Sequence, residues 1–252
     1  MKTSTTEAII LKTSDFSESD RLIHVYARDG GRLSGLAKGA RRSRKRFVNS
    51  LEPLSLVELT YREGRTLAWV DACKLVEPYL ALRTDVERWG YAALVCEVIL
   101  EMAPEGESQP DLFELLRETL QRLSYGRDAL NVVLLFLLRF LDLMGYLPAL
   151  EKCSVCRRSL EEATRWWWRL PEGAMFCPDH RPREGRERAY GIDLGTLLSI
   201  RQSRLLPMHR IWRLHFTQEK KKALFLAFVD TVRHHIRKDL KSLRLLRQIH
   251  LL

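Results

Sequence analysis

Apolar and polar positions change their spacing at about one third of the chain. Over residues 7–77, short runs rich in Ile, Leu, Val and Tyr are separated by turns that contain glycine, a pattern typical of β-strands. Five such short strands favour a small closed barrel of the OB type, with an SH3-like barrel as the alternative. The expected strands span residues 7–14, 21–28, 32–38, 54–62 and 66–77.

Beyond residue 78 the apolar positions recur at helical spacing. Asp111 and Glu114 have the spacing of a capping box, while Asp193 and Thr217 are expected to be N-caps. The expected helices span residues 85–103, 111–123, 128–145, 193–201 and 217–238. The sequence therefore predicts an α+β protein in which a barrel precedes a helical domain.

Two short pairs of potential metal ligands, Cys-x2-Cys and Cys-x2-His, are separated by twenty residues inside the helical part. A tight turn within each pair can present both side chains to one tetrahedral zinc ion. Four protein ligands leave no open position for substrate, which predicts one structural zinc ion per chain. Asp179 is an alternative to the histidine as fourth ligand. The candidate ligands are Cys153, Cys156, Cys177 and His180.

The residues between the two ligand pairs predict a hairpin that turns at residues 171–173. A module of this size has almost no core of its own, so we expect Trp166, Trp167 and Trp168 to pack it onto the helices rather than to stack on bases. The predicted organisation is a barrel over residues 1–78 and a helical domain over residues 79–252. The zinc-binding, finger-like insertion occupies about residues 150–182 of the helical domain.

Charge is unevenly distributed. The net charge of +10 divides into +4 for residues 1–78, −5 for residues 79–150, 0 for residues 151–180 and +11 for residues 181–252. Such polarity favours a polyanionic partner, with a solvated basic surface as the alternative.

The segment between the third and fourth expected strands contains six cations within nine residues and no acid. These charges repel one another unless a polyanion neutralises them, so this loop is the candidate DNA-binding site. Tyr26, Phe47, Tyr61 and Trp69 are candidate base-stacking residues that equally suit a barrel core. The candidate DNA-binding residues are Lys38, Arg41, Arg42, Arg44, Lys45 and Arg46.

No phosphate-binding glycine loop, His-Glu-x-x-His helix or nucleophile elbow occurs, and the seven histidines are scattered, so we expect a binding protein rather than an enzyme. Residues 1–11 lack the pattern of a signal peptide, and the apolar run at 129–138 is too short to span a bilayer. The expected location is the cytoplasm. Cys73 and Cys96 lie among apolar neighbours and are expected to be inert core thiols.

Several motifs, in their order and spacing, resemble those of the bacterial RecO family of DNA-repair proteins over essentially the whole chain. They are EAIIL at 7–11, ESDRL at 18–22, LAKGARR at 36–42, LMGYLP at 143–148 just before the first cysteine pair, and LKSLRLL at 240–246. One departure is His180, because many members that keep a metal site have cysteine at the fourth position.

The resemblance implies a recombination mediator associated with the nucleoid. Such a protein would bind single- and double-stranded DNA, anneal complementary strands, and work with RecR to help RecA replace single-strand-binding protein. It also implies that the acidic C-terminal tail of single-strand-binding protein docks on the helical domain, for which Phe225, Phe228, Arg233 and Arg237 form a candidate pocket. The competing hypothesis is a protein-interaction scaffold whose basic surface is incidental.

Overall fold

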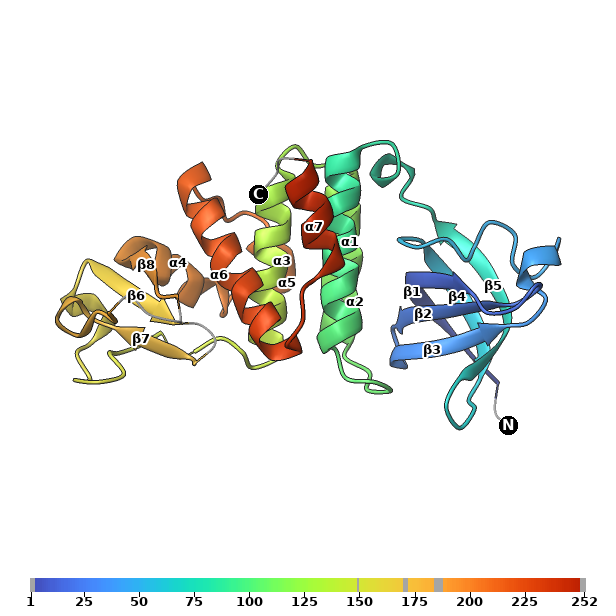
Figure 1. Cartoon of the computed structure of the whole chain (residues 1–252), viewed down its shortest axis with the longest axis horizontal. Helices are drawn as coiled ribbons and strands as arrows, with labels where there is room; N and C mark the ends of the chain where they lie inside the picture. The colour runs from blue at the N-terminus through green and yellow to red at the C-terminus, as the bar shows by residue number, and fades with distance from the viewer. Residues whose placement is uncertain (1–2, 149, 170–171, 184–187, 250–252) are drawn as a thin grey trace. The chain divides into compact units, whose positions relative to one another are not determined.

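The computed structural model describes residues 3–148, 150–169, 172–183 and 188–249, and Figure 1 labels its elements. The chain divides into two compact units. Unit 1 contains Met1–Ala129 together with Asp239–Leu252, and unit 2 contains Leu130–Lys238. Among the described helices, none combines the length and the apolar character that crossing a membrane would need.

The N-terminal strands of unit 1 close into a barrel (Figure 1). The strands are β1 (Thr3–Asp15), β2 (Arg21–Ala27), β3 (Gly31–Ala37), β4 (Leu56–Arg62) and β5 (Ala68–Glu77). Their order around the ring is β1-β2-β3-β5-β4, and every neighbouring pair is antiparallel except the parallel β3–β5 pair. This is an OB-like arrangement, so the predicted barrel is confirmed in its OB form.

The barrel core follows from the two-residue alternation of its strands. Ile23 and Val25 on β2 and Val57 and Leu59 on β4 all point inward and are fully buried. Phe47, from the loop between β3 and β4, completes this core. That long loop is therefore anchored by burial of its own apolar side chain.

Three helices complete unit 1: α1 (Val86–Met102), α2 (Pro110–Tyr125) and α7 (Lys241–Gln248). The carboxylate of Asp85 caps α1 by accepting from the backbone N–H groups of Glu87 and Arg88. The predicted capping box of α2 is wrong, because Asp111 lies inside the first turn and the helix begins at Pro110. A proline ring has the φ angle of a first helical residue and lacks an N–H group that would need a cap.

Helix α7 packs on α1 although more than a hundred residues separate them. Gly90 on α1 makes room for this approach, since a Cβ atom there would lie 2.7 Å from Leu246 of α7. The carboxylate of Glu97 accepts hydrogen bonds from the backbone N–H groups of Lys241 (2.9 Å) and Ser242 (2.8 Å). Glu97 thus satisfies the first turn of α7 from outside that helix.

Unit 2 is built around α3, an apolar helix that is buried over most of its length. Asp193 and Thr217 cap α4 and α6 by accepting from the backbone N–H groups of Thr196 (3.0 Å) and Lys220 (3.5 Å), which confirms both predicted N-caps. The helices of this unit are α3 (Ala129–Leu143), α4 (Leu194–Ser203), α5 (Met208–Ile211) and α6 (Gln218–Ile236).

A small antiparallel sheet carries the predicted metal module. Its order is β7-β6-β8, formed by β6 (Arg165–Arg169), β7 (Ala174–Phe176) and β8 (Tyr190–Asp193). The strands on either side of the predicted hairpin, β6 and β7, pair as expected. Within the predicted turn, Pro171 lies outside the described residues. The third strand, β8, was not predicted.

Candidate nucleic-acid interface and metal centre

The cationic loop, residues 38–46, begins where β3 ends. Gly39 takes a left-handed conformation (φ 66°) and starts the short 3-10 turn Ala40–Arg42. The backbone N–H of Arg41 donates to Ser19 O (3.0 Å), which ties this loop to the loop between β1 and β2. The carbonyl of Arg46 accepts from Cys73 N on β5 (2.9 Å). The loop is therefore held at both ends by backbone hydrogen bonds.

Asp20 forms a second link between the same two loops. Its carboxylate accepts from the backbone N–H of Gly39 (2.8 Å) and from the hydroxyl of Ser19 (2.9 Å). These hydrogen bonds, that of Gly39 first, lower the pKa of the Asp20 carboxyl. The carboxylate thus stays ionised well below neutral pH and keeps the departure of the loop from β3 in place.

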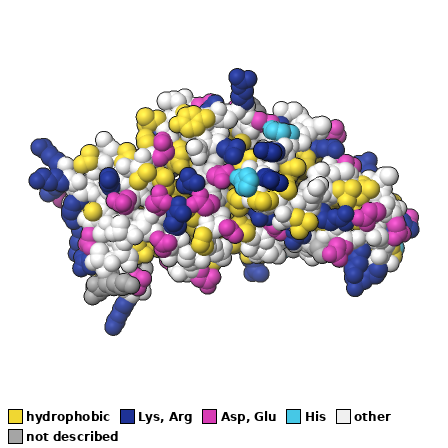
Figure 2. Space-filling model, turned by 180° about the vertical axis from the view of Figure 1, so that it is seen from behind, with side chains coloured by type: hydrophobic (Ala, Val, Ile, Leu, Met, Phe, Trp, Pro, Cys, Tyr) yellow, Lys and Arg dark blue, Asp and Glu magenta, His cyan; other side chains and the backbone are white. Residues whose placement is uncertain are grey.

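All six predicted DNA-binding cations are exposed, and Figure 2 shows Lys and Arg side chains gathered over the barrel. Arg41 and Arg42 make only long contacts with acids, at 3.7 Å to Asp15 and 4.0 Å to Glu18. Exposed pairs of this kind contribute little and are readily replaced by another anion.

The remaining cations of the loop differ in how firmly they are held. Arg46 donates from Nη2 to the carbonyl of Lys38 (2.8 Å), and Lys38 Nζ lies 4.5 Å from the centre of the Trp69 ring. Arg44 and Lys45 form no ion pair within the described part of the chain. Arg44 and Lys45 are consequently the most available for phosphate.

The candidate stacking residues separate by burial. Tyr26, Phe47 and Tyr61 are buried in the barrel or beneath neighbouring segments, which removes them from any base. Trp69 is half-buried and lies under Lys38, at the edge of the cationic loop. Phe16, which was not among the predicted stacking residues, is 57% exposed in the β1–β2 loop. Its signal was a single aromatic residue in an otherwise polar loop.

The outer face of β2 and β3, where OB barrels often hold nucleic acid, is partly covered by this chain's own segment between α1 and α2. Arg32 donates from Nε to the carbonyl of Ala103 (2.8 Å) and pairs with Glu105 (3.6 Å). Arg28 pairs with Glu114 on α2 (2.8 Å). These contacts engage the cations of the β2–β3 face with acids and a carbonyl of the same chain, whereas the 38–46 loop keeps its cations exposed.

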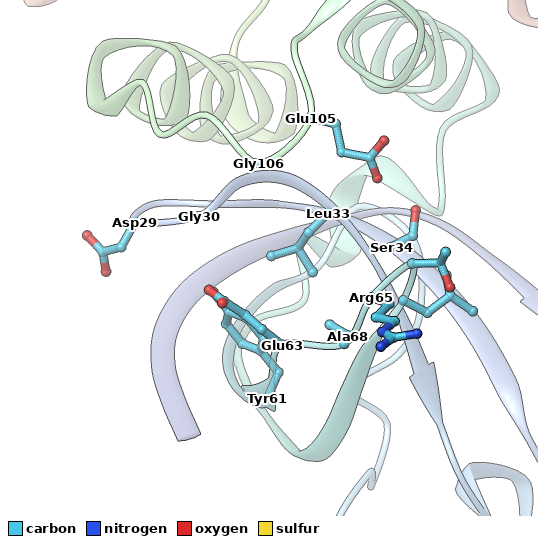
Figure 3. A pocket seen from close by; sticks show the side chains of 13 residues that line it. Asp29, Gly30, Leu33, Ser34, Tyr61, Glu63, Arg65, Ala68, Glu105 and Gly106 are labelled. Carbon is cyan, nitrogen blue, oxygen red and sulfur yellow. The ribbon is translucent and has the colours of Figure 1, made fainter. Parts of the chain in front are cut away.

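A cavity of about 540 Å³ lies between the β4–β5 turn, the β2–β3 turn and the segment after α1 (Figure 3). Its lining includes the carboxylates of Asp29, Glu63 and Glu105 and one cation, Arg65. Three acids against one arginine disfavour a phosphate ligand. The lining of the cavity is therefore mainly acidic, in contrast to the cationic loop.

The four predicted metal ligands come together in unit 2. Their ligand atoms all lie within 4.8 Å of one another, so the cluster could hold a metal ion. Cys156 Sγ is 3.7 Å from Cys177 Sγ, which in turn is 3.3 Å from His180 Nδ1. Tetrahedral zinc with bonds of about 2.3 Å to sulfur and about 2.0 Å to nitrogen requires separations of about 3.8 and 3.5 Å. The donor set and its spacing therefore fit zinc.

Backbone geometry explains why each ligand pair converges. Arg157, directly after the first pair, adopts a left-handed conformation (φ 65°), and its N–H donates to Cys153 O (3.1 Å). In the second pair, Pro178 opens a 3-10 turn in which His180 N donates to Cys177 O (3.0 Å). Each turn brings the second side chain of its pair back toward the first.

The thiols of the cluster differ in acidity. Burial raises the pKa of Cys153, but hydrogen bonds from the backbone N–H groups of Cys177, Cys156 and Val155 outweigh it and lower that pKa to about 6. Burial and the neighbouring thiols raise the pKa of Cys177. Cys153 thus forms a thiolate readily, and its negative charge disfavours ionisation of Cys177. A bound cation would relieve this repulsion.

Asp179, the alternative fourth ligand, is engaged elsewhere. Its carboxylate pairs with Arg158 (2.7 Å) and is largely exposed, whereas the side chain of His180 joins the three cysteines. A carboxylate neutralised by an arginine has less reason to bind zinc, which itself prefers nitrogen and sulfur.

Two of the three consecutive tryptophans form the base of the module. Trp166 and Trp168 are fully buried, and the Trp168 ring meets Phe228 of α6 edge to face at 6.1 Å. Trp166 donates from Nε1 to the carbonyls of Leu160 and Ala163 within the module, and Trp167 is only half-buried. The contact of Trp168 therefore confirms, for that tryptophan alone, the prediction that the tryptophans pack the module onto the helices. It also contradicts the candidate pocket around Phe225 and Phe228, since both rings are buried and present no surface to a partner.

The fold and the cluster together define a class of protein in which an OB-like barrel is joined to a helical region that carries a Cys3His module. Two family models match this chain, "Recombination protein O N terminal" over residues 1–79 and "Recombination protein O C terminal" over residues 83–244. The protein named "DNA repair protein RecO" in Syntrophobacter fumaroxidans is 61% identical over 99% of both chains.

More distant relatives carry the same name. The RecO protein of Syntrophus aciditrophicus is 31% identical over 97% of this chain and 95% of its own, and that of Geobacter metallireducens is 31% identical over 99% of both. This chain therefore belongs to the RecO family of DNA-repair proteins, which are recombination mediators and not enzymes.

Proposed function

We propose that this protein binds single- and double-stranded DNA through the cationic loop and anneals complementary strands. The observation that carries the proposal is the exposure of all six loop cations on a firmly anchored loop, with Arg44 and Lys45 unpaired among the described residues. Annealing breaks no covalent bond. It requires two phosphate backbones to be neutralised while the base edges stay free to pair, which a cationic surface can do.

In this proposal the chain works with RecR to help RecA replace single-strand-binding protein, whose acidic tail docks on the helical domain. Membership of the RecO family supports these partners and a location in the cytoplasm, at the nucleoid. The barrel, residues 1–78, is the DNA-binding domain, and residues 79–252 form the helical domain with the metal module at about 150–182.

We further propose that the Cys3His cluster binds one zinc ion per chain through Cys153, Cys156, Cys177 and His180. With four protein ligands the ion would have no open position, so its contribution would be to the folding of the module. The fit of the interatomic distances supports this assignment.

The test is a strand-annealing assay on single-stranded DNA coated with single-strand-binding protein. The variant replaces the unpaired and weakly paired cations and Arg46 with alanine, at Arg41, Arg42, Arg44, Lys45 and Arg46. We expect it to fold like the wild type, to bind DNA more weakly at every sequence and to anneal more slowly. Equal DNA affinity and equal annealing would remove the loop from the mechanism and favour a scaffold that contacts proteins alone.

A further inference from the structure

The metal module exposes one face of its small sheet. Along β6 the side chains alternate, so Trp166 and Trp168 face the interior while Arg165, Trp167 and Arg169 share the opposite face. The charge of residues 151–180 is zero overall, which conceals this concentration of arginine.

Trp167 occupies the middle of that face. Its cross-strand neighbours are Phe176 on β7 and Gly191 on β8. Gly191 has no side chain, and the guanidinium of Arg165 lies over it: a Cβ atom there would be 3.3 Å from Arg165 Nη2 and 3.8 Å, an ordinary contact distance, from Trp167 Nε1. The glycine thus leaves space beside the half-buried Trp167 that the arginine side chain occupies.

Arginines surround this ring. The guanidinium carbon of Arg181 lies 5.2 Å from the Trp167 ring centre and that of Arg165 lies 5.9 Å from it. The guanidinium carbon of Arg169, also on β6, lies 5.8 Å from the ring centre of Phe176 on the neighbouring strand β7. An aromatic ring flanked by cations is the arrangement by which single-stranded nucleic acids are held, with bases on rings and phosphates on arginines.

The described acids of the module leave most of the positive charge of this face unpaired. Asp179 pairs with Arg158, and Glu161 pairs with Arg201 (2.8 Å). Asp193, the cross-strand partner of Arg165, pairs with Lys220 (3.0 Å). Within the described residues Arg165 and Arg181 form no ion pair, and only Arg169 pairs with an acid, at 3.4 Å. The face is therefore positive although its segment is neutral.

We propose that this face is a second contact surface for single-stranded nucleic acid, with Trp167 stacking on a base and Arg165 and Arg181 binding the adjacent phosphates. The inference rests on the proposed DNA-binding function and deepens it. The first surface belongs to unit 1 and this one to unit 2, so a single chain carries two places at which a strand is held. Annealing needs two strands.

The candidate metal ligands adjoin both flanks of this surface. Phe176 immediately precedes Cys177, and Arg181 immediately follows His180 at the end of the 3-10 turn. The ligands would thus set the positions of an aromatic ring and a cation beside Trp167. A rigid module would therefore serve binding, because it would hold these two side chains in position beside Trp167.

The experiment measures fluorescence anisotropy of a labelled oligothymidylate over a range of salt concentrations. Trp167→Leu and the double variant Arg165→Gln/Arg181→Gln are prepared both in the wild-type chain and in the five-residue loop variant. In the loop-variant background we expect Trp167→Leu to lower affinity at least about fivefold, the smallest effect typical of losing one stacked base. The double arginine variant should lower affinity as well, because it removes two phosphate contacts. The double variant should also flatten the salt slope by about 1.4, or about 0.7 per lost phosphate contact. Trp167→Tyr should keep most of the affinity.

The matched control is Arg210→Gln/Arg213→Gln, which removes the same charge from exposed positions of unit 2 outside this sheet. Thermal unfolding must be unchanged in the arginine variants. An affinity and slope equal to those of the control overturn the proposal, even if the loop variant is impaired and the proposed function stands. If these variants lose binding to an acidic peptide and keep their affinity for DNA, the face is a protein-docking site and the proposal is also wrong.

Discussion

Replacing Arg44 and Lys45 together with glutamine removes the two loop cations for which the described structure shows neither an ion pair nor a hydrogen bond nor a ring contact, without touching the anchoring residue Phe47. Each phosphate contact made to a single strand contributes about 0.7 to the slope of log affinity against log salt. Two lost contacts therefore lower that slope by about 1.4. Over a fourfold rise in salt, the affinity ratio of wild type to variant should shrink by about sevenfold.

The assay is anisotropy with a labelled oligothymidylate at several salt concentrations between about 50 and 200 mM. The control is Arg65→Gln/Lys74→Gln, which removes one exposed arginine and one exposed lysine from the same barrel but outside the loop. If the control and the loop variant show the same slope, net charge alone governs binding. The reasoning from the unpaired state of Arg44 and Lys45 would then be refuted.

Two further predictions concern the metal module and the core thiols. After metal removal by a chelator, Cys156, which is exposed, should become alkylated in mass spectrometry of peptides, whereas Cys73 and Cys96 stay protected because burial raises the pKa values to about 11 and 12. Labelling of Cys73 or Cys96 at the same rate would contradict this. Trp168→Ala should lower the free energy of unfolding by about 3–5 kcal/mol in chemical denaturation. Trp167→Ala, on the exposed face, should cost clearly less; equal losses would show that both rings are structural.

The strands of the barrel were predictable because each buries one face, and the alternation of side chains records that burial locally. The start of β4 shows the limit of this approach. The predicted strand began at residue 54, but Leu54 has a left-handed backbone (φ 68°) and the strand starts at Leu56. A hydrophobicity pattern cannot distinguish an apolar residue in a turn, such as Leu54, from one in a strand.

Local sequence patterns did not predict the features that depend on contacts with residues distant in the sequence. Strand β8 has four residues, and it is stabilised by pairing with β6 rather than by a pattern of its own. The coverage of the β2–β3 face also depends on distant residues, since Arg32 and Glu105 are far apart in the chain. Neither could be read from local periodicity.

The candidate sites also combine features that local sequence predicts with features that depend on three-dimensional contacts. Ligand spacing offered both His180 and Asp179 as the fourth ligand, and only the structure separates them, because Asp179 pairs with Arg158 while His180 joins the three cysteines. The cationic loop was recognisable by composition. The difference between the braced Arg46 and the unpaired Arg44 required coordinates, because it depends on which backbone carbonyls lie within reach.

The packing of α7 against α1 has a consequence for the order in which the chain can fold. Unit 1 needs residues 239–252, which are synthesised after all of unit 2. On the ribosome, the barrel and unit 2 can form while α1 still lacks the helix that covers Gly90 and while Glu97 lacks its hydrogen-bond donors. The nascent chain therefore exposes an apolar strip of α1 until α7 has been synthesised, so this strip is covered only after all of unit 2 has been made.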